Sequence, residues 1–213
     1  MPIEVFDYRQ DIKNLVITPE IRSRFMRMEP GTISPGHTHD LGHEIFLILA
    51  GQAEFNIDGE IAVLGPGQGC FARAHQWHEV RVVGDEPMTM YLSVTPHIEP
   101  THTLWHGREH KLPPHYGTST RLERAARREP PAPAAEIADR FVTAARSLAA
   151  AAITNAGEQD QAATAFVRAA NAGDRAAAKA AMDAMWTQLY TLFQALQQLE
   201  TAWNELAPQA AEM

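Results

Sequence analysis

Two histidines and a glutamate near the start of the chain have the types and spacing of metal ligands. His37 and His39 are two residues apart, so in an extended strand both imidazoles point to the same face. Glu44 begins the apolar run Ile45–Leu49, which predicts a buried strand. With a third imidazole supplied from elsewhere, these side chains form a mixed nitrogen and oxygen site for a divalent transition metal.

The residues around these ligands follow a longer pattern. The spacing Gly31-x5-His37-x-His39-x4-Glu44-x6-Gly51 matches the first signature motif of the cupin family at every defined position. The chain therefore resembles the cupins over about residues 20–95. The resemblance implies a β-barrel of the double-stranded β-helix (jelly-roll) type.

The second cupin motif is only partly present. His78 occupies the position of the family's ligand histidine, whereas Arg73, His75 and Val82 stand where the family has proline, glycine and asparagine. The resemblance implies one divalent transition metal (Fe, Mn, Ni, Co, Cu or Zn) held by His37, His39, Glu44 and His78. The alternative is that the histidines are ordinary surface or core residues.

Several neighbours of the ligands are candidates for the chemistry. His75 or Glu79 can exchange protons at the mouth of the pocket, and Arg73 can hold an anionic substrate. The alternatives are a polar loop residue at position 75 and a solvent-facing arginine at 73. Strand parity places four apolar side chains on the faces of Glu44 and His78, where they line a substrate pocket or fill the core: Phe46, Ile48, Val80 and Val82.

The elements that position these residues read as short strands with glycine and proline turns between them. Such regular spacing predicts an all-β sandwich or barrel. The predicted strands are Ile21–Met28, Ile45–Leu49, Ala53–Ile57, Glu60–Leu64, Cys70–Ala74, His78–Val83 and Met88–Thr95.

The composition changes at about residue 118, because all ten histidines precede residue 116. We expect a barrel with an N-terminal arm and a His-rich C-terminal strap at 1–118. A linker with a short helix follows at 119–134, and an all-α, coiled-coil-like domain of three helices at 135–213. The last of these helices carries a heptad seam, which predicts either a fold back onto the first helix or a homodimer. The seam consists of Met182, Met185, Leu189, Leu192, Leu196, Leu199, Trp203 and Leu206.

Charge and hydropathy exclude some classes of function. The net charge of −8 and the pI near 5.7 argue against nucleic-acid binding. No apolar run reaches the length of a membrane span, and the charged first twenty residues do not form a signal peptide. Cys70 is the only cysteine, which fits a cytoplasmic location.

The resemblance implies a metal-dependent, oxygen-using oxidoreductase, of the dioxygenase kind, that acts on a small organic molecule. Two alternatives remain open from the sequence. One is a metal-dependent isomerase or lyase without redox chemistry, and the other is a small-ligand-binding protein whose helical region mediates assembly.

Overall fold

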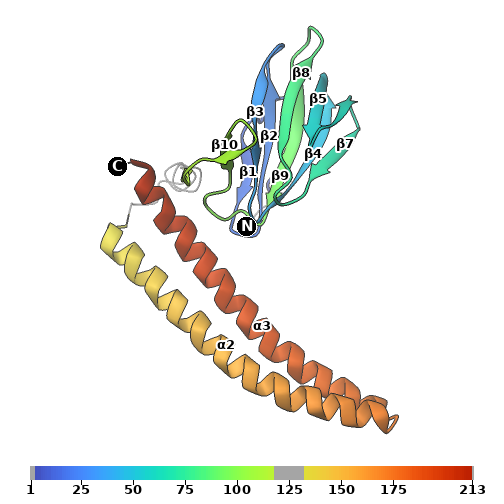
Figure 1. The fold of residues 1–213 in the computed structure, drawn as a ribbon, viewed down its shortest axis with the longest axis vertical. Helices are drawn as coiled ribbons and strands as arrows, with labels where there is room; N and C mark the ends of the chain where they lie inside the picture. The colour runs from blue at the N-terminus through green and yellow to red at the C-terminus, as the bar shows by residue number, and fades with distance from the viewer. Residues whose placement is uncertain (1–2, 118–131, 213) are drawn as a thin grey trace. The chain divides into compact units, whose positions relative to one another are not determined.

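The computed structural model describes residues 3–117 and 132–212. Contacts divide the chain into two units, one of residues 1–131 with 207–213 and the other of residues 132–206. The first unit is built of strands and the second of two helices (Figure 1). The short helix predicted near residues 119–128 lies outside the described residues.

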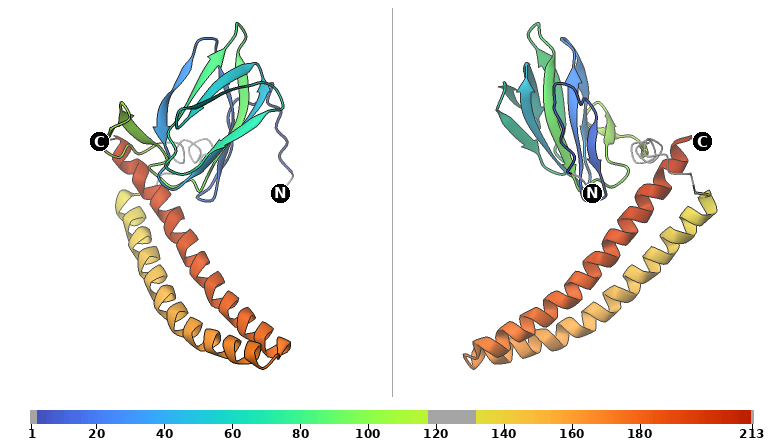
Figure 2. Two further views of the ribbon diagram at one scale, coloured as in Figure 1. Left: turned by 45° about the vertical axis from the view of Figure 1, so that its right-hand side comes forward. Right: turned by 180° about the vertical axis from the view of Figure 1, so that it is seen from behind.

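The first unit contains two antiparallel sheets that face each other (Figures 1 and 2). The five-stranded sheet has the order β1-β2-β9-β4-β7. Its strands are β1 (Asn14–Ile17), β2 (Arg22–Met28), β4 (His43–Ala50), β7 (Gly69–Ala72) and β9 (Met88–Thr95).

The six-stranded sheet has the order β11-β10-β3-β8-β5-β6. Its strands are β3 (Ile33–Thr38), β5 (Gln52–Ile57), β6 (Glu60–Leu64), β8 (His78–Val83), β10 (Thr103–His106) and β11 (His110–Lys111). The predicted jelly-roll architecture is confirmed. The last two strands fall in the predicted strap, and β10 pairs with β3.

The space between the sheets is filled by alternate residues of each strand, as the two-residue period of a strand requires. In β4, Glu44, Phe46 and Ile48 are buried while the residues between them are exposed. The hydrophobic core consists of Met28, Phe46, Ile48, Ala53, Phe55, Ala72, Val80, Val82, Met88, Met90 and Leu92.

The second unit is an antiparallel hairpin of α2 (Ala134–Asn171) and α3 (Arg175–Leu206), and a 3-10 turn, η1 (Ala207–Glu212), follows in sequence (Figure 2). The prediction of three helices is wrong, because α2 continues through Asn155 and Gly157. The Gln159 amide donates hydrogen bonds to Asn155 Oδ1 (3.0 Å) and to the Met185 carbonyl on α3 (2.9 Å). Packing against α3 thus outweighs the low helix propensity of a single glycine.

The turn between the helices follows the sequence signals. Gly173 has φ +71°, the left-handed conformation that commonly ends a helix. Asp174 is the N-cap of α3, since its Oδ1 accepts a hydrogen bond from the backbone N–H of Ala177 at 3.0 Å.

The apolar seam of α3 is centred on small residues. Ala181, Ala195 and Ala202 are buried, and of the predicted seam Met182 and Leu196 are exposed. Small side chains let two helices approach closely, so the larger ones lie at the margins of the contact. Trp186, Tyr190 and Phe193 are also exposed, and the homodimer that would cover them stays a prediction. Within residues 3–117 and 132–212, no helix combines the length and hydropathy needed to cross a bilayer.

Replacing Gly157 with alanine should stabilise the hairpin. Gly157 is exposed and helical, and a Cβ added there meets nothing within 4 Å. We expect a gain of about 1 kcal/mol in unfolding free energy, because alanine loses less backbone entropy than glycine in a helix. Chemical denaturation of the full chain measures it. The matched control is Gly173→Ala, which should destabilise because its φ of +71° disfavours any Cβ.

Candidate metal centre

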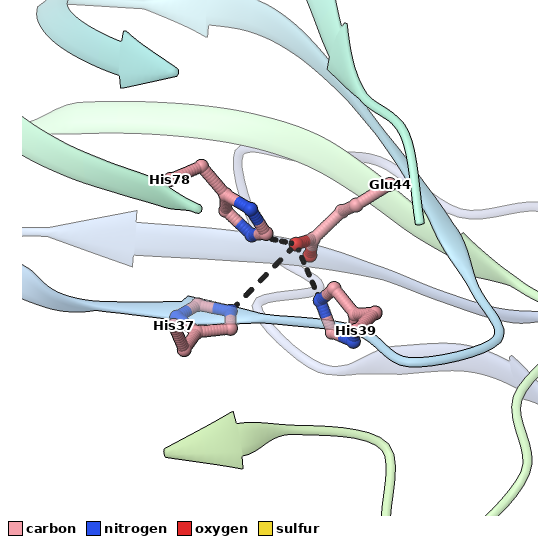
Figure 3. A group of neighbouring side chains, drawn as sticks. All are labelled: His37, His39, Glu44 and His78. Carbon is pink, nitrogen blue, oxygen red and sulfur yellow. Dashed lines mark hydrogen bonds and ion pairs between the residues drawn. The ribbon is translucent and has the colours of Figure 1, made fainter. Parts of the chain in front are cut away.

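Strands β3, β4 and β8 bring four ligand side chains together. His37 lies in β3, His39 directly follows it, and His78 is the first residue of β8. His37 and His78 are register partners across the β3–β8 ladder, while Glu44 reaches across from β4 in the other sheet. One ligand atom from each of the four residues lies within 4.8 Å of all the others (Figure 3). The predicted convergence is confirmed.

The carboxylate of Glu44 occupies the middle of the group. Its Oε2 lies 3.0 Å from Nε2 of His39, 3.0 Å from Nε2 of His78 and 3.9 Å from Nε2 of His37 (Figure 3). Glu44, His39 and His78 are buried, and His37 is nearly so. All three imidazoles therefore present the same nitrogen to one carboxylate oxygen.

Backbone carbonyls fix the orientation of each ring. Nδ1 of His37 donates to the Pro35 carbonyl at 2.9 Å, and Nδ1 of His78 donates to the Gln76 carbonyl at 2.9 Å. Nδ1 of His39 donates to the carbonyl of Thr101. A carbonyl only accepts hydrogen bonds, so each Nδ1 carries a proton and each ring turns its Nε2 into the site.

This arrangement fits a cation. An Nε2 atom 3.0 Å from a carboxylate oxygen needs a proton or a metal ion between the two, because a bare nitrogen lone pair would repel the oxygen. His37 Nε2 is also buried without a hydrogen-bond partner among the described residues. Nδ1 bonded to a backbone carbonyl and Nε2 free to bind is the usual arrangement of a metal-ligating histidine. The four residues thus form a site that can hold a divalent metal ion.

The electrostatics also suit a metal. Burial raises the pKa of the Glu44 carboxyl, but the hydrogen bonds from His39 and His78 outweigh burial, so the net pKa is lowered and the group is ionised. Burial lowers the pKa of His37 to about 4, and the charge of nearby His78 adds to this effect. Near pH 7 the ligands are thus one carboxylate and a neutral His37.

His102 stands next to the ligands and was not predicted as a site residue. Its ring centroid lies 4.8 Å from that of His37 and 4.9 Å from that of His39. Burial lowers the pKa of His102 to about 3, with a further contribution from His37. The preceding carbonyl, of Thr101, holds His39. The strap therefore contributes both a support for a ligand and a fourth imidazole.

The side chains of the three candidates near the second motif are exposed or point to the opposite face from the ligands. His75 is exposed at φ +68°, and its backbone N–H donates to the His39 carbonyl at 2.8 Å. Glu79 follows His78 in β8, so its side chain points to the opposite face. Arg73 is exposed with its guanidinium over the ring of exposed Phe71 (5.7 Å), on the outer surface.

The four predicted pocket residues belong to the hydrophobic core. The ring centroid of Phe46 lies 5.8 Å from that of His78. Ile48 is fully buried, and Val80 and Val82 are 3% and 4% exposed. Phe46 therefore forms part of the apolar wall beside the metal ligands, and all four residues are core residues.

Sequence reasoning also missed two arginines in β2. Across the β2–β9 ladder, Arg22 pairs with Val94 and Arg24 with Leu92. Val94 and Leu92 are buried and also pair with Glu44 and Phe46 of β4. Directly paired residues share a face, so both arginines lie on the inner side of the sheet. The sequence offered one signal for this orientation. Met26 and Met28 are apolar and lie at even spacing from Arg24, so they share its face of the strand.

Gly36 and Trp77 precede two of the ligands and pack against each other. A Cβ added to Gly36 would lie 1.8 Å from Trp77 Cζ2. Only glycine allows this approach between β3 and β8, where the register shifts just before His37.

We therefore expect Gly36→Ala to lower the melting temperature by several degrees and to weaken metal binding about tenfold, since overpacking costs about 1–3 kcal/mol. Thermal unfolding and metal titration measure the two effects. Combining Gly36→Ala with Trp77→Leu should restore part of both. A double variant no better than Gly36→Ala alone would contradict this account.

Comparisons with known proteins agree with this fold. Residues 24–95 match the Cupin_2 family, described as a cupin domain. A polyketide synthase CurC from Streptomyces cyaneus is 31% identical over 101 residues, which cover 45% of this chain and 65% of that protein. The chain thus spans less than two thirds of that relative.

Several solved structures are similar. One is a conserved protein with a double-stranded β-helix domain from Klebsiella pneumoniae, at 20% identity and a TM-score of 0.42, over 45% of this chain and 91% of that one. Another is KdgF from Halomonas sp., at 22% identity and a TM-score of 0.37, over 40% and 76%. With two facing antiparallel sheets and the family match over residues 24–95, the strand-built unit of this chain contains a cupin domain.

Proposed function

We propose that the cupin domain is a metal-dependent oxidoreductase that uses oxygen to oxidise a small organic molecule. The observation that carries the proposal is the set of three oriented Nε2 atoms and one ionised carboxylate within 4.8 Å. Three neutral imidazoles and one carboxylate would leave a divalent ion with a net positive charge, and octahedral geometry would leave two positions for other ligands.

His37, His39, Glu44 and His78 would hold the metal. When bound, it would supply Lewis acidity, a binding position for a substrate oxygen and, for a redox-active ion, a path for electrons. The protein would supply the surroundings. Phe46 would exclude water from one side, and His102, whose ring lies beside two ligands, would accept a hydrogen bond from substrate and orient it.

The test is anaerobic loading of the full chain with each of Fe(II), Mn(II), Co(II), Ni(II), Cu(II) and Zn(II), followed by oxygen-uptake assays. Phenols, thiols and 1,3-dicarbonyl compounds serve as substrates. We expect uptake with one or more redox-active ions and none with zinc. His102→Gln should then lower turnover while metal content stays unchanged. An absence of uptake with every loaded ion would contradict the proposal.

A second candidate is an isomerase or lyase that uses the metal only as a Lewis acid. The curated relative is named a polyketide synthase, and polyketides contain carbonyl groups, whose oxygen a metal can polarise without carrying electrons. This candidate predicts turnover of a 1,3-dicarbonyl compound by the zinc-loaded protein under nitrogen. The oxygen-using enzyme predicts none under the same conditions.

A further inference from the structure

We propose that Arg24, assisted by Arg22, forms an anion subsite beside the metal ligands and binds a carboxylate group of the substrate. The inference deepens the proposed function, because it names the substrate class of the same site, and it rests on that function.

The inner face of the five-stranded sheet changes from charged to apolar along its strands. At one end Arg22, Val94 and Glu44 form a row across β2, β9 and β4. Arg24, Leu92 and Phe46 form the next row, and the rows beyond consist of methionines and Ile48. The two arginines thus share the end of the interior that contains the metal ligand Glu44.

The strand order sets the spacing between the arginines and Glu44. Arg22 and Glu44 are two strands apart, so their backbones are separated by roughly 10 Å. Glu44 turns its carboxylate towards the histidines, and Arg22 and Arg24 belong to β2, on the other side of β9 from Glu44. A substrate bound by a guanidinium at one end and by the metal at the other would therefore be a short organic molecule.

Arg24 has no partner that explains its position. It makes no hydrogen bond or ion pair recorded among the described residues, and its Nε is buried without a partner. Burial lowers the pKa of this guanidinium, which only the charge of Glu44 opposes. A half-buried charge without hydrogen bonds is unfavourable in the free protein, so a ligand that pairs with it would gain from the contact.

The free donors favour a carboxylate over a larger anion. Arg22 already donates from Nε to Asn14 Oδ1 at 3.1 Å, whereas the Nε of Arg24 has no acceptor among the described residues. One guanidinium fork matches the two oxygens of a carboxylate. The negative charge of Glu44 also disfavours a dianion such as phosphate.

The experiment compares two probes of similar shape, acetoacetate and neutral 2,4-pentanedione, by calorimetric titration of the zinc-loaded full chain. We expect Arg24→Gln to weaken acetoacetate binding by about 10-fold or more, since hydrogen bonds to charged groups contribute about 1.5–3 kcal/mol. Binding of 2,4-pentanedione should change less than twofold. The matched control is Arg27→Gln on the same strand, because Arg27 is exposed and paired with Glu29 at 3.2 Å.

A second measurement tells a lost ligand contact apart from damage to the fold. If Arg24 awaits a ligand, Arg24→Met should raise the melting temperature of the ligand-free protein by about 2–4 °C, because it removes an unpaired charge. A lower melting temperature would show that Arg24 has a structural partner and would overturn the inference.

The remaining outcomes separate this inference from the proposed function. If wild type binds no zinc, the proposed function fails. The subsite is then tested without metal: acetate should raise the melting temperature of wild type and should not raise that of Arg24→Gln. Equal weakening of both probes, or stronger protection by inorganic phosphate than by acetate, would overturn the carboxylate subsite.

Discussion

Replacing Glu44 with alanine should abolish tight metal binding. Glu44 supplies the only negative charge among the four ligands, and its Oε2 lies 3.0 Å from two of the three Nε2 atoms. Its removal leaves a divalent ion with neutral ligands only, in a buried site that disfavours uncompensated charge. We expect metal content after desalting to fall from about one ion per chain to a trace, measured by elemental analysis.

The same substitution should remove the stabilisation that metal gives to the fold. At a free-metal concentration 100 times the dissociation constant, binding stabilises the native state by about 2.7 kcal/mol. For a chain of this size that corresponds to a rise of roughly 5–10 °C in melting temperature. Wild type should show this rise on loading, and Glu44→Ala should show none.

The control for this prediction is His110→Ala, which removes an exposed imidazole from β11. It should retain both the metal content and the thermal shift of wild type. Equal metal content in Glu44→Ala and wild type would show that the ion binds elsewhere. A loss of metal from His110→Ala would point to a ligand set other than the four residues in Figure 3.

The ligand set could be predicted because its information is local. His37 and His39 are neighbours in sequence, Glu44 begins the next strand, and strand parity decides which face each occupies. His78 required only the register of a second motif. The strands between these residues are short and bounded by glycine or proline, so their order along the chain and their spacing could also be predicted from the sequence.

The rest of the site depends on contacts between distant segments. His102 reaches the ligands because β10 pairs with β3, and no local pattern specifies that pairing. Arg24 faces inward because β2 aligns with β9, although basic residues alternating with Phe25 favour the opposite orientation. The ring of Phe25 instead lies on the other face, against Tyr8 and Tyr91.

The long helix α2 illustrates the same limit. Asn155 and Gly157 are local signals for the end of a helix, and the sequence alone predicts a break there. The hydrogen bond from Gln159 to the Met185 carbonyl joins α2 to a residue 26 positions away. Tertiary packing of this kind overrides propensity, which differs by only about 1 kcal/mol for a single glycine.

Acid should unfold the metal-free protein well above the pKa of its carboxylates. Burial lowers the pKa of His97 to about 4, with a further contribution from the charge of Arg22, and the pKa values of His37 and His102 are lowered to about 4 and 3. Between pH 6.5 and 4 the unfolded chain therefore binds protons that the folded protein does not. Stability is complete above pH 6.5 and falls as the pH decreases.

The expected loss is large. A pKa lowered from 6.5 to about 4 corresponds to about 3 kcal/mol for His97 alone, and three such groups approach the whole stability of a typical domain. Glu44 contributes only below its ordinary pKa of 4.5, so the interval from pH 6.5 to 4.5 reports on the histidines. Urea denaturation in EDTA across this interval measures the slope of stability against pH.

Substituting His97 separates this cause from general acid sensitivity. His97→Gln keeps a polar side chain in a fully buried position but cannot take up a proton. Whatever it does to stability at pH 7, it should reduce the slope between pH 6.5 and 4.5 by close to one proton, because one of the three buried imidazoles no longer titrates. His110→Ala, which removes an exposed imidazole, should leave the slope unchanged. A flat wild-type profile over this interval would mean that the three buried histidines are already protonated in the folded state.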